Sequence, residues 1–279
     1  MISLFHQVGH QCSKVTTDAY STSFSSAIRL LHKDIRQPIY DIYGFVRFAD
    51  EIVDTFHDYD KSILLEEYRE DTWKAISNGI SLNPILHSFQ HVVRKYNIPH
   101  ELVEAFLHSM EMDLEKAEYH SAEELDEYIY GSAEVVGLMC LCVFCEGDME
   151  LYAKLKGPAR KLGAAFQKIN FLRDIQADYL ALSRTYFPGF NFHQFDEESK
   201  RKIEEDIRAD FDAALEGIRG LPWKAKFGVY TAYKYYNTLF AKICKMQPRK
   251  VLKQRVRVPD IQKAFIVLSA SCYNKLNLI

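Results

Sequence analysis

The chain has 279 residues, enough for one large domain or two small ones, and 48% hydrophobic with 26% charged residues is a globular, not a disordered, composition. Its net charge of −3 argues against a nucleic-acid partner, which would need a basic surface. Six cysteines in a chain of this length predict reduced thiols and exclude a dense disulfide framework.

The sequence gives no sign of export. The opening MISLFHQVGHQCSK lacks a basic segment followed by an apolar one, so no signal peptide is expected. The longest apolar run, 135–145, is about half of the roughly 20 residues that span a bilayer. It contains a CxCxxC pattern at Cys140, Cys142 and Cys145 but no second cluster of ligands. We therefore expect a cytoplasmic protein in which these cysteines belong to the core.

Long stretches without Gly or Pro, and no sustained alternation of period two, predict helices throughout. Asp196 is placed to cap a strongly charged helix whose mixed charges predict a solvated face. The residues predict one all-α domain over 1–279. Taken in chain order, the predicted helices cover 18–32, 36–57, 62–78, 83–95, 100–118, 122–146, 149–182, 197–219, 222–246 and 258–276.

The predicted helix 36–57 carries two carboxylates on one face. Asp50 and Asp54 are four residues apart, and Arg47 and Tyr43 continue the same stripe towards the N-terminus. Such a pair repels itself unless a cation lies between its members, and carboxylate oxygens suit a hard cation such as Mg²⁺. An exposed acidic face is the alternative, because DxxxD is common.

The predicted helix 149–182 repeats this arrangement. One of its stripes carries two amides and two carboxylates: Gln167, Asn170, Asp174 and Asp178. If the stripe faced a cavity, ions, water or a charged ligand would have to satisfy these groups.

Two acidic helices that face each other would hold Mg²⁺ ions that grip a diphosphate, since Mg²⁺ is usually bound by one or two carboxylates together with substrate phosphates. The ions would neutralise a diphosphate leaving group. Arg47, Arg173 and Arg184 would add forked donors to the phosphate oxygens.

The chain resembles the phytoene/squalene synthases, and most closely the bacterial phytoene synthases. The resemblance covers nearly the whole chain, and the motifs occur in the same order as in that family. The motifs that carry it are YSTSFSSAIRLL (20–31), IYGFVRFADEIVD (42–54), MDLEKAEYHSAEELDEYIYGSAEVVGLM (112–139), GAAFQKINFLRDIQADYLALSRTYFP (163–188), YYNTLFAKI (235–243) and QRVRV (254–258).

The resemblance implies the helical isoprenoid synthase fold with a central cavity. It implies Mg²⁺, with Mn²⁺ as an alternative, and a head-to-head condensation of two isoprenoid diphosphates through a cyclopropylcarbinyl diphosphate. Two geranylgeranyl diphosphates giving phytoene, in carotenoid biosynthesis, is the favoured reaction. Two farnesyl diphosphates giving dehydrosqualene or squalene is the alternative, and a noncatalytic binding or assembly factor is a third reading. No NADPH is expected, since no Gly-rich dinucleotide motif is present.

The resemblance also assigns roles by motif position. The metal-associated residues are Asp50, Asp54, Asp174 and Asp178, with Asn170 as a further ligand. The substrate-binding residues are Arg47, Arg173, Asn170, Gln167, Ser21, Ser23, Arg255 and Gly137. The tyrosines expected to steer the cation or the last proton are Tyr43, Tyr128 and Tyr236.

One motif departs from the family pattern. Where small residues usually stand, this chain has Glu134, which we expect to point outward or to pair with an arginine. Gly137 fits the pattern and allows either passage of a substrate tail or close helix packing. Because the hydrocarbon product is insoluble in water, we expect transient peripheral contact with the inner membrane. The sequence leaves the oligomeric state open.

Overall fold

The structure is a computed structural model that describes residues 2–116, 118–182, 185–189 and 195–275, without the side chains of residues 178, 181, 182 and 275. Asp178 therefore lies on a described helix, but its side chain, like Arg184, is outside the described part of the chain.

The described residues are almost entirely helical, which confirms the all-α prediction. Their only extended pairing is an isolated bridge between Glu118 and Thr185. The α-helices are α1 (Ile2–Tyr20), α2 (Thr22–Arg29), α3 (Lys33–Thr55), α4 (Lys61–Asn78), α5 (Pro84–Lys95), α6 (His100–Glu115), α7 (Ala122–Ile129), α8 (Val135–Cys145), α9 (Met149–Leu182), α10 (Glu197–Gly220), α11 (Trp223–Cys244), α12 (Pro248–Val251) and α13 (Asp260–Lys275), and a π-helical segment (Tyr130–Glu134) joins α7 to α8.

The first predicted helix, 18–32, was wrong. Residues 2–20 form α1, and the chain breaks at Ser21, whose side chain caps α2 by accepting a hydrogen bond from the backbone N–H of Phe24. The buried face of α1 consists of Gly9, Ser13 and Thr17, so no apolar periodicity marks it. These small residues allow close packing, and Ser13 Oγ lies 2.7 Å from Ser88 Oγ of α5.

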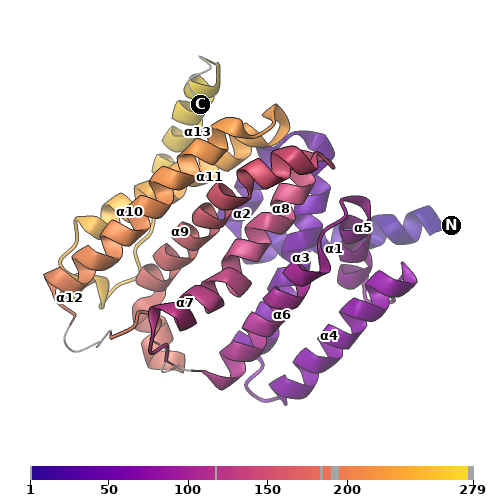
Figure 1. Cartoon of the computed structure of the whole chain (residues 1–279), viewed down its shortest axis with the longest axis horizontal. Coiled ribbons are helices and arrows are strands. Elements are labelled where there is room, and N and C mark those ends of the chain that lie inside the picture. The colour runs from indigo at the N-terminus through magenta and orange to yellow at the C-terminus, as the bar shows by residue number, and fades with distance from the viewer. Residues whose placement is uncertain (1, 117, 183–184, 190–194, 276–279) are drawn as a thin grey trace.

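The long helix α9 organises one half of the molecule (Figure 1), where it packs against α8, the π-helical segment, α10 and α11. In the other half, α3 contacts α1, α4, α5, α6 and α8. Phe45 anchors α3 in the core, because its ring stacks on Phe89 with centroids 3.9 Å apart and also contacts Phe106. Each acidic helix is thus fixed by apolar packing on the face opposite its carboxylates.

The predicted helix 122–146 is interrupted by the π-helical segment, which is held between two neighbours. A side chain at Gly131 would come within 2.6 Å of Ser109 Cβ on α6, and one at Gly163 within 2.9 Å of the Ala133 carbonyl oxygen. Only glycine permits this approach on both sides. Single π turns of this kind are frequent at functional sites.

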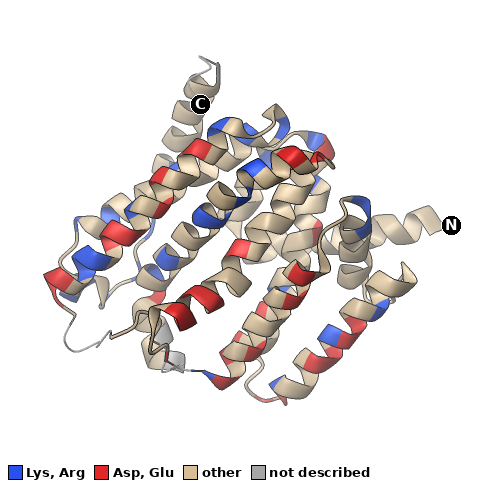
Figure 2. Ribbon diagram, in the orientation of Figure 1, with Lys and Arg blue, Asp and Glu red and all other residues tan. Residues whose placement is uncertain are grey.

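The charged helix α10 begins where predicted, with Asp196 accepting a hydrogen bond from the Ser199 N–H at 2.8 Å. Figure 2 shows basic and acidic residues interleaved along it. The prediction of a solvated face holds only in part, because Lys200 and Asp210 are buried, and Asp210 pairs with the buried Lys168 of α9 at 2.7 Å.

Residues 122–145 are long and apolar enough for a bilayer span, which the sequence reading of residues 135–145 alone missed. In the structure, 61% of an apolar 18-residue stretch within this segment is buried inside the fold, as in a core helix. Cys142 and Cys145 are buried there and Cys140 is half-buried, and burial raises the pKa of the Cys140 thiol to about 12. The prediction of core cysteines is confirmed for Cys142 and Cys145.

Candidate functional site

The carboxylates of α3 lie in a strongly negative environment. The pKa of Asp50 is raised from 3.8 to about 7, mainly by burial and also by Asp54 and Asp113, while Arg47 opposes the shift. Asp50 is nevertheless half-buried, so its carboxyl group is both poorly hydrated and reachable. A poorly hydrated carboxyl group with further carboxyl groups beside it is a suitable place for a hard cation.

Arg47 is held at the same place. It pairs with Glu51 one turn along α3, and its guanidinium lies over the ring of Tyr20, 4.4 Å from the centroid. Its Nε atom is buried and makes no hydrogen bond within the described part of the chain. A buried N–H that lacks an acceptor is costly unless a ligand supplies one, and phosphate oxygens are suitable acceptors.

Tyr43 and Ser21 meet beside Arg47. The Tyr43 hydroxyl is hydrogen-bonded with Ser21, the residue that caps α2, and burial raises the pKa of Tyr43. Ser23 is half-buried on the first turn of α2. The structure therefore brings together the predicted residues of motifs 20–31 and 42–54.

On α9, Asp174 lies between two guanidinium groups. Arg173 Nη2 is 2.6 Å from Asp174 Oδ2, and Arg255 Nε is 2.8 Å from Asp174 Oδ1. Arg255 is in the segment between α12 and α13, so a distant part of the chain joins the predicted site here.

Further along the same stripe, Asn170 connects α9 to α11. The Tyr236 hydroxyl donates to Asn170 Oδ1 at 3.3 Å, and the Asn170 amide donates to Gln167 Oε1 at 3.4 Å. The Tyr236 ring stacks on Phe166 with centroids 3.9 Å apart. Tyr236 is therefore both buried and fixed beside the predicted amides.

Asp113 was missed as a site residue, although it lies in the quoted motif 112–139. It is buried on α6, and the Tyr128 hydroxyl donates to both of its oxygens, at 2.9 and 3.0 Å. An acidic residue between apolar neighbours, Met112 and Leu114, was the available signal.

A set of aromatic rings links this position to α9. Tyr128 stacks near Phe171, with centroids 6.1 Å apart, and Phe171 stacks on Tyr186 at 3.8 Å. These contacts run from Asp113 of α6 through Tyr128 to Phe171 of α9, and Asp113 also raises the pKa of Asp50 on α3. That the two acidic groups face each other across a central cavity stays a prediction.

The family follows from comparison with known proteins. The squalene/phytoene synthase profile matches residues 17–262. The chain belongs to this family. Two relatives are similar along the sequence: presqualene diphosphate synthase of Rhodopseudomonas palustris, 31% identical over 182 residues (63% of this chain, 61% of the relative), and phytoene synthase of Rhodobacter capsulatus, 29% identical over 271 residues (90% and 77%).

Solved structures of the squalene/phytoene synthase family share this fold. A dehydrosqualene synthase in complex with ligand matches with a TM-score of 0.84 at 20% identity, over 97% of this chain and 98% of that one. A squalene synthase from Alicyclobacillus acidocaldarius matches with a TM-score of 0.75 at 21% identity, over 88% and 95%. The predicted isoprenoid synthase fold is confirmed.

The residue that departs from the squalene/phytoene synthase pattern is paired as predicted. Glu134 is buried at the end of the π-helical segment and accepts a hydrogen bond from Arg160 Nε at 2.5 Å. Burial raises the pKa of Glu134, and Arg160 opposes this shift. At Gly137 a side chain would lie 3.4 Å from the Ala159 carbonyl oxygen of α9, so this glycine lies where α8 and α9 pack.

Proposed function

We propose that this chain condenses two isoprenoid diphosphates head to head. The observation that carries the proposal is the pairing of Asp174 of α9 with Arg173 and with Arg255, together with the poorly hydrated Asp50 of α3, whose pKa is raised to about 7. Both groups retain the charged residues that a diphosphate and its metal ions need. A noncatalytic relative would have no reason to keep them.

The residues fit Mg²⁺, with Mn²⁺ as the alternative. Asp50 and Asp54 on α3, and Asp174 with Asn170 and Asp178 on α9, are the proposed ligands. The raised pKa of Asp50 supports this, because burial and the neighbouring Asp54 both disfavour its negative charge, and a bound cation would offset both effects. Bound Mg²⁺ would neutralise the departing diphosphate.

The arginines orient the leaving group. Arg173 and Arg255 donate to Asp174 in this structure. When Asp174 binds a metal cation, the two arginines would donate to phosphate oxygens instead. Arg47 presents its buried Nε for the same purpose. Further polar groups of the proposed diphosphate site come from Ser21, which is hydrogen-bonded with Tyr43, and from Ser23 on the same turn of α2. On α9, Gln167 adds a polar group next to Asn170.

The tyrosines suit a carbocation. Ring faces stabilise positive charge without reacting with it, by about 1–2 kcal/mol each where water is absent. Tyr128 and Tyr236 are buried and Tyr43 is half-buried, so water that would quench a cation is largely kept from their rings. In the proposed reaction one diphosphate leaves to give an allylic cation, which the second substrate's double bond attacks. The resulting cation loses a proton as the cyclopropane ring closes, and a cyclopropylcarbinyl diphosphate forms.

Geranylgeranyl diphosphate is the proposed substrate and phytoene the product. The phytoene synthase relative that aligns with 90% of this chain supports this choice. The names of the presqualene diphosphate and dehydrosqualene synthases favour the second candidate, two farnesyl diphosphates. We also propose a cytoplasmic enzyme that contacts the membrane when its product leaves.

Product analysis tests the proposal. The purified chain is offered C15 and C20 diphosphates in competition, with Mg²⁺ and after its removal. We expect a C40 hydrocarbon that depends on the metal and no requirement for NADPH. A C30 product would support the second candidate. If neither a hydrocarbon nor a cyclopropylcarbinyl diphosphate forms, the chain is not a condensing enzyme.

A further inference from the structure

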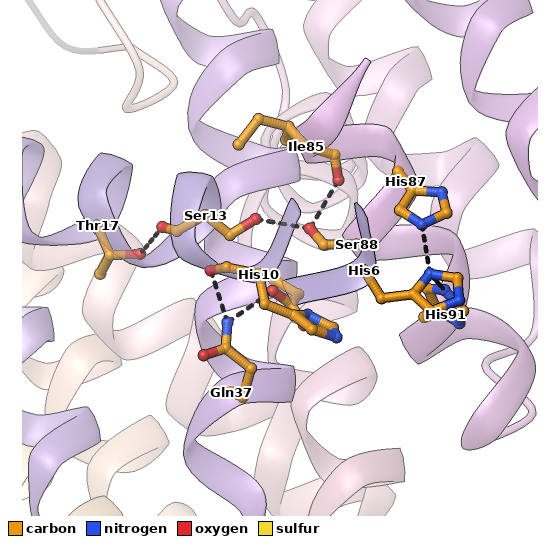
Figure 3. Close-up of polar contacts among 10 residues, drawn as sticks. His6, His10, Ser13, Thr17, Gln37, Ile85, His87, Ser88 and His91 are labelled. Carbon is orange, nitrogen blue, oxygen red and sulfur yellow. Dashed lines mark hydrogen bonds and ion pairs between the residues drawn. The ribbon is translucent and has the colours of Figure 1, made fainter. Parts of the chain in front are cut away.

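Three histidines from two helices, none of them assigned to the proposed diphosphate site, converge on one another (Figure 3). His6 comes from α1, and His87 and His91 come from successive turns of α5. His6 Nδ1 lies 2.8 Å from His87 Nε2 and 2.9 Å from His91 Nε2. One ligand atom from each residue falls within 4.8 Å of the other two. We call these three residues the histidine cluster.

Hydrogen bonding alone does not account well for this arrangement. A neutral imidazole nitrogen carries either one hydrogen or one in-plane lone pair, so it makes one well-directed hydrogen bond. His6 Nδ1 has two nitrogen neighbours at hydrogen-bonding distance. The rings of His87 and His91 lie at 7° and 90° to the ring of His6, which prevents the three from sharing one plane. A metal ion among the three nitrogens would satisfy all of their lone pairs together.

The surroundings of the histidine cluster favour neutral rings, whose nitrogen lone pairs are able to bind a cation. Burial lowers the pKa of His91 to about 4, and it lowers the pKa of His87, with His6 and His10 adding to both shifts. These rings are therefore neutral near pH 7, which is the form that coordinates metals. His87 is fully buried and the other two are half-buried, so the cluster is closed to solvent at His87 and accessible to solvent at His6 and His91.

We propose that His6, His87 and His91 bind one transition-metal ion, best matched by Zn²⁺, and that this ion fastens α1 to α5. Three imidazoles with a water in the fourth position form a regular zinc environment. The donor set excludes Mg²⁺, which prefers oxygen ligands. His10, one turn further along α1, is not among the residues whose ligand atoms converge, and its Nδ1 is held by Asp41 at 2.8 Å.

Binding requires two small changes in the cluster. Zn–N bonds of about 2.0–2.1 Å in a tetrahedron place ligand nitrogens about 3.3 Å apart, so the contacts of 2.8 and 2.9 Å must open by about half an ångström. His87 Nδ1 accepts a long hydrogen bond of 3.3 Å from the Ser81 N–H, which places the hydrogen of neutral His87 on Nε2. That hydrogen must move to Nδ1 when Nε2 binds the ion, and the Ser81 contact is then lost.

Calorimetric titration with Zn²⁺ tests the site. The full chain is used, free of any affinity tag and of bound metal, with Mg²⁺ in excess to cover the carboxylates. We expect one Zn²⁺ per chain in the wild type. His6→Gln and His91→Gln should weaken binding by at least about 100-fold, since loss even of outer groups around a metal costs about 10–100-fold. The matched control is His108→Gln, an exposed histidine of α6, which should bind as the wild type does.

Two further measurements separate this site from the acidic one. Co²⁺ should give the intense visible absorption of a four-coordinate, nitrogen-rich site in the wild type. Zn²⁺ should raise the Tm of the wild type and the His108 variant but not of the other two variants. Weak, six-coordinate Co²⁺ absorption in the wild type would overturn the proposal even if a variant folds poorly. Zn²⁺ binding by the His6 and His91 variants that is as tight as in the wild type would also overturn it.

Discussion

Arg255 and Asp174 are 81 positions apart in the sequence, and their Nε and Oδ1 atoms lie 2.8 Å from each other. This contact holds the segment between α12 and α13 next to the polar stripe of α9. It gives Arg255, which was assigned to the site only by motif position, a defined neighbour in the proposed site. Because the Arg255 side chain is 54% exposed, its ion pair with Asp174 should contribute little to the stability of the fold.

We expect Arg255→Gln to reduce kcat/KM by about 10–100-fold, because loss of one charged donor to an oxyanion typically costs this much or more. Stability should change little. The comparison is Arg257→Gln, which removes the same charge from an exposed position two residues away. Steady-state kinetics with the preferred diphosphate would contradict the assignment if both variants lost activity equally.

Asp50→Asn should stop turnover and stabilise the metal-free protein. The pKa of Asp50 is raised from 3.8 to about 7, so the folded protein binds more protons than the unfolded chain between these values. Its stability therefore falls as the pH rises through this range. At pH 8 the variant should gain about 1–3 kcal/mol, less than the full shift implies because the carboxyl group is partly solvated.

Urea unfolding at pH 5 and pH 8 without Mg²⁺ measures this gain. It should be clearly larger at pH 8. Asp58→Asn, in the exposed turn after α3, serves as the control and should be neutral at both values. A variant that loses stability at pH 8 would show that Asp50 is already compensated by a neighbouring cation.

The sequence predicted the acidic helices well because their apolar faces repeat with helical period, as at Phe45 in α3. It failed for α1, where the buried face is Gly9, Ser13 and Thr17 and close contact replaces apolar area. It also could not locate the break at residues 130–134, since a π turn depends on how Gly131 and Gly163 meet their neighbours. Both failures concern packing between helices, which leaves no periodic signal in a single segment.

Within the site, spacing along one helix was predictable but contacts between motifs were not. The four-residue steps from Asn170 to Asp174 follow from helix geometry. The hydrogen bond from Tyr128 to Asp113, 15 residues away across a loop, does not. Motif resemblance supplied the residue types, and only the fold shows which of them are neighbours.

Tyr128→Phe should destabilise the protein by about 1–3 kcal/mol, because the buried Asp113 loses a donor that serves both of its oxygens. Thermal unfolding measures the loss, and Tyr59→Phe at an exposed position should be neutral. Turnover separates two roles for Tyr128. If its ring face alone steers the cation, the phenylalanine variant should keep kcat within about tenfold. A much larger fall in kcat would assign the hydroxyl to the proton step.

His10→Gln should weaken the pH dependence of stability between about pH 6 and 8. His10 Nδ1 bonds the buried Asp41 at 2.8 Å, and this contact raises the pKa of His10, while burial and Lys95 of α5 oppose it. Gln37 of α3 also donates to Asp41, and burial raises the pKa of that carboxyl group.

Both shifts mean that the folded protein binds protons more tightly than the unfolded chain. The contribution of His10 is therefore complete below pH 6.5 and is lost as the pH rises through its raised pKa. Urea unfolding of the wild type should show lower stability at pH 8 than at pH 6, measured with a chelator present. The His10 variant should show a smaller drop, and His57→Gln, at an exposed position, should behave as the wild type. An equal drop in all three proteins would mean that the pair stays in one protonation state over this range.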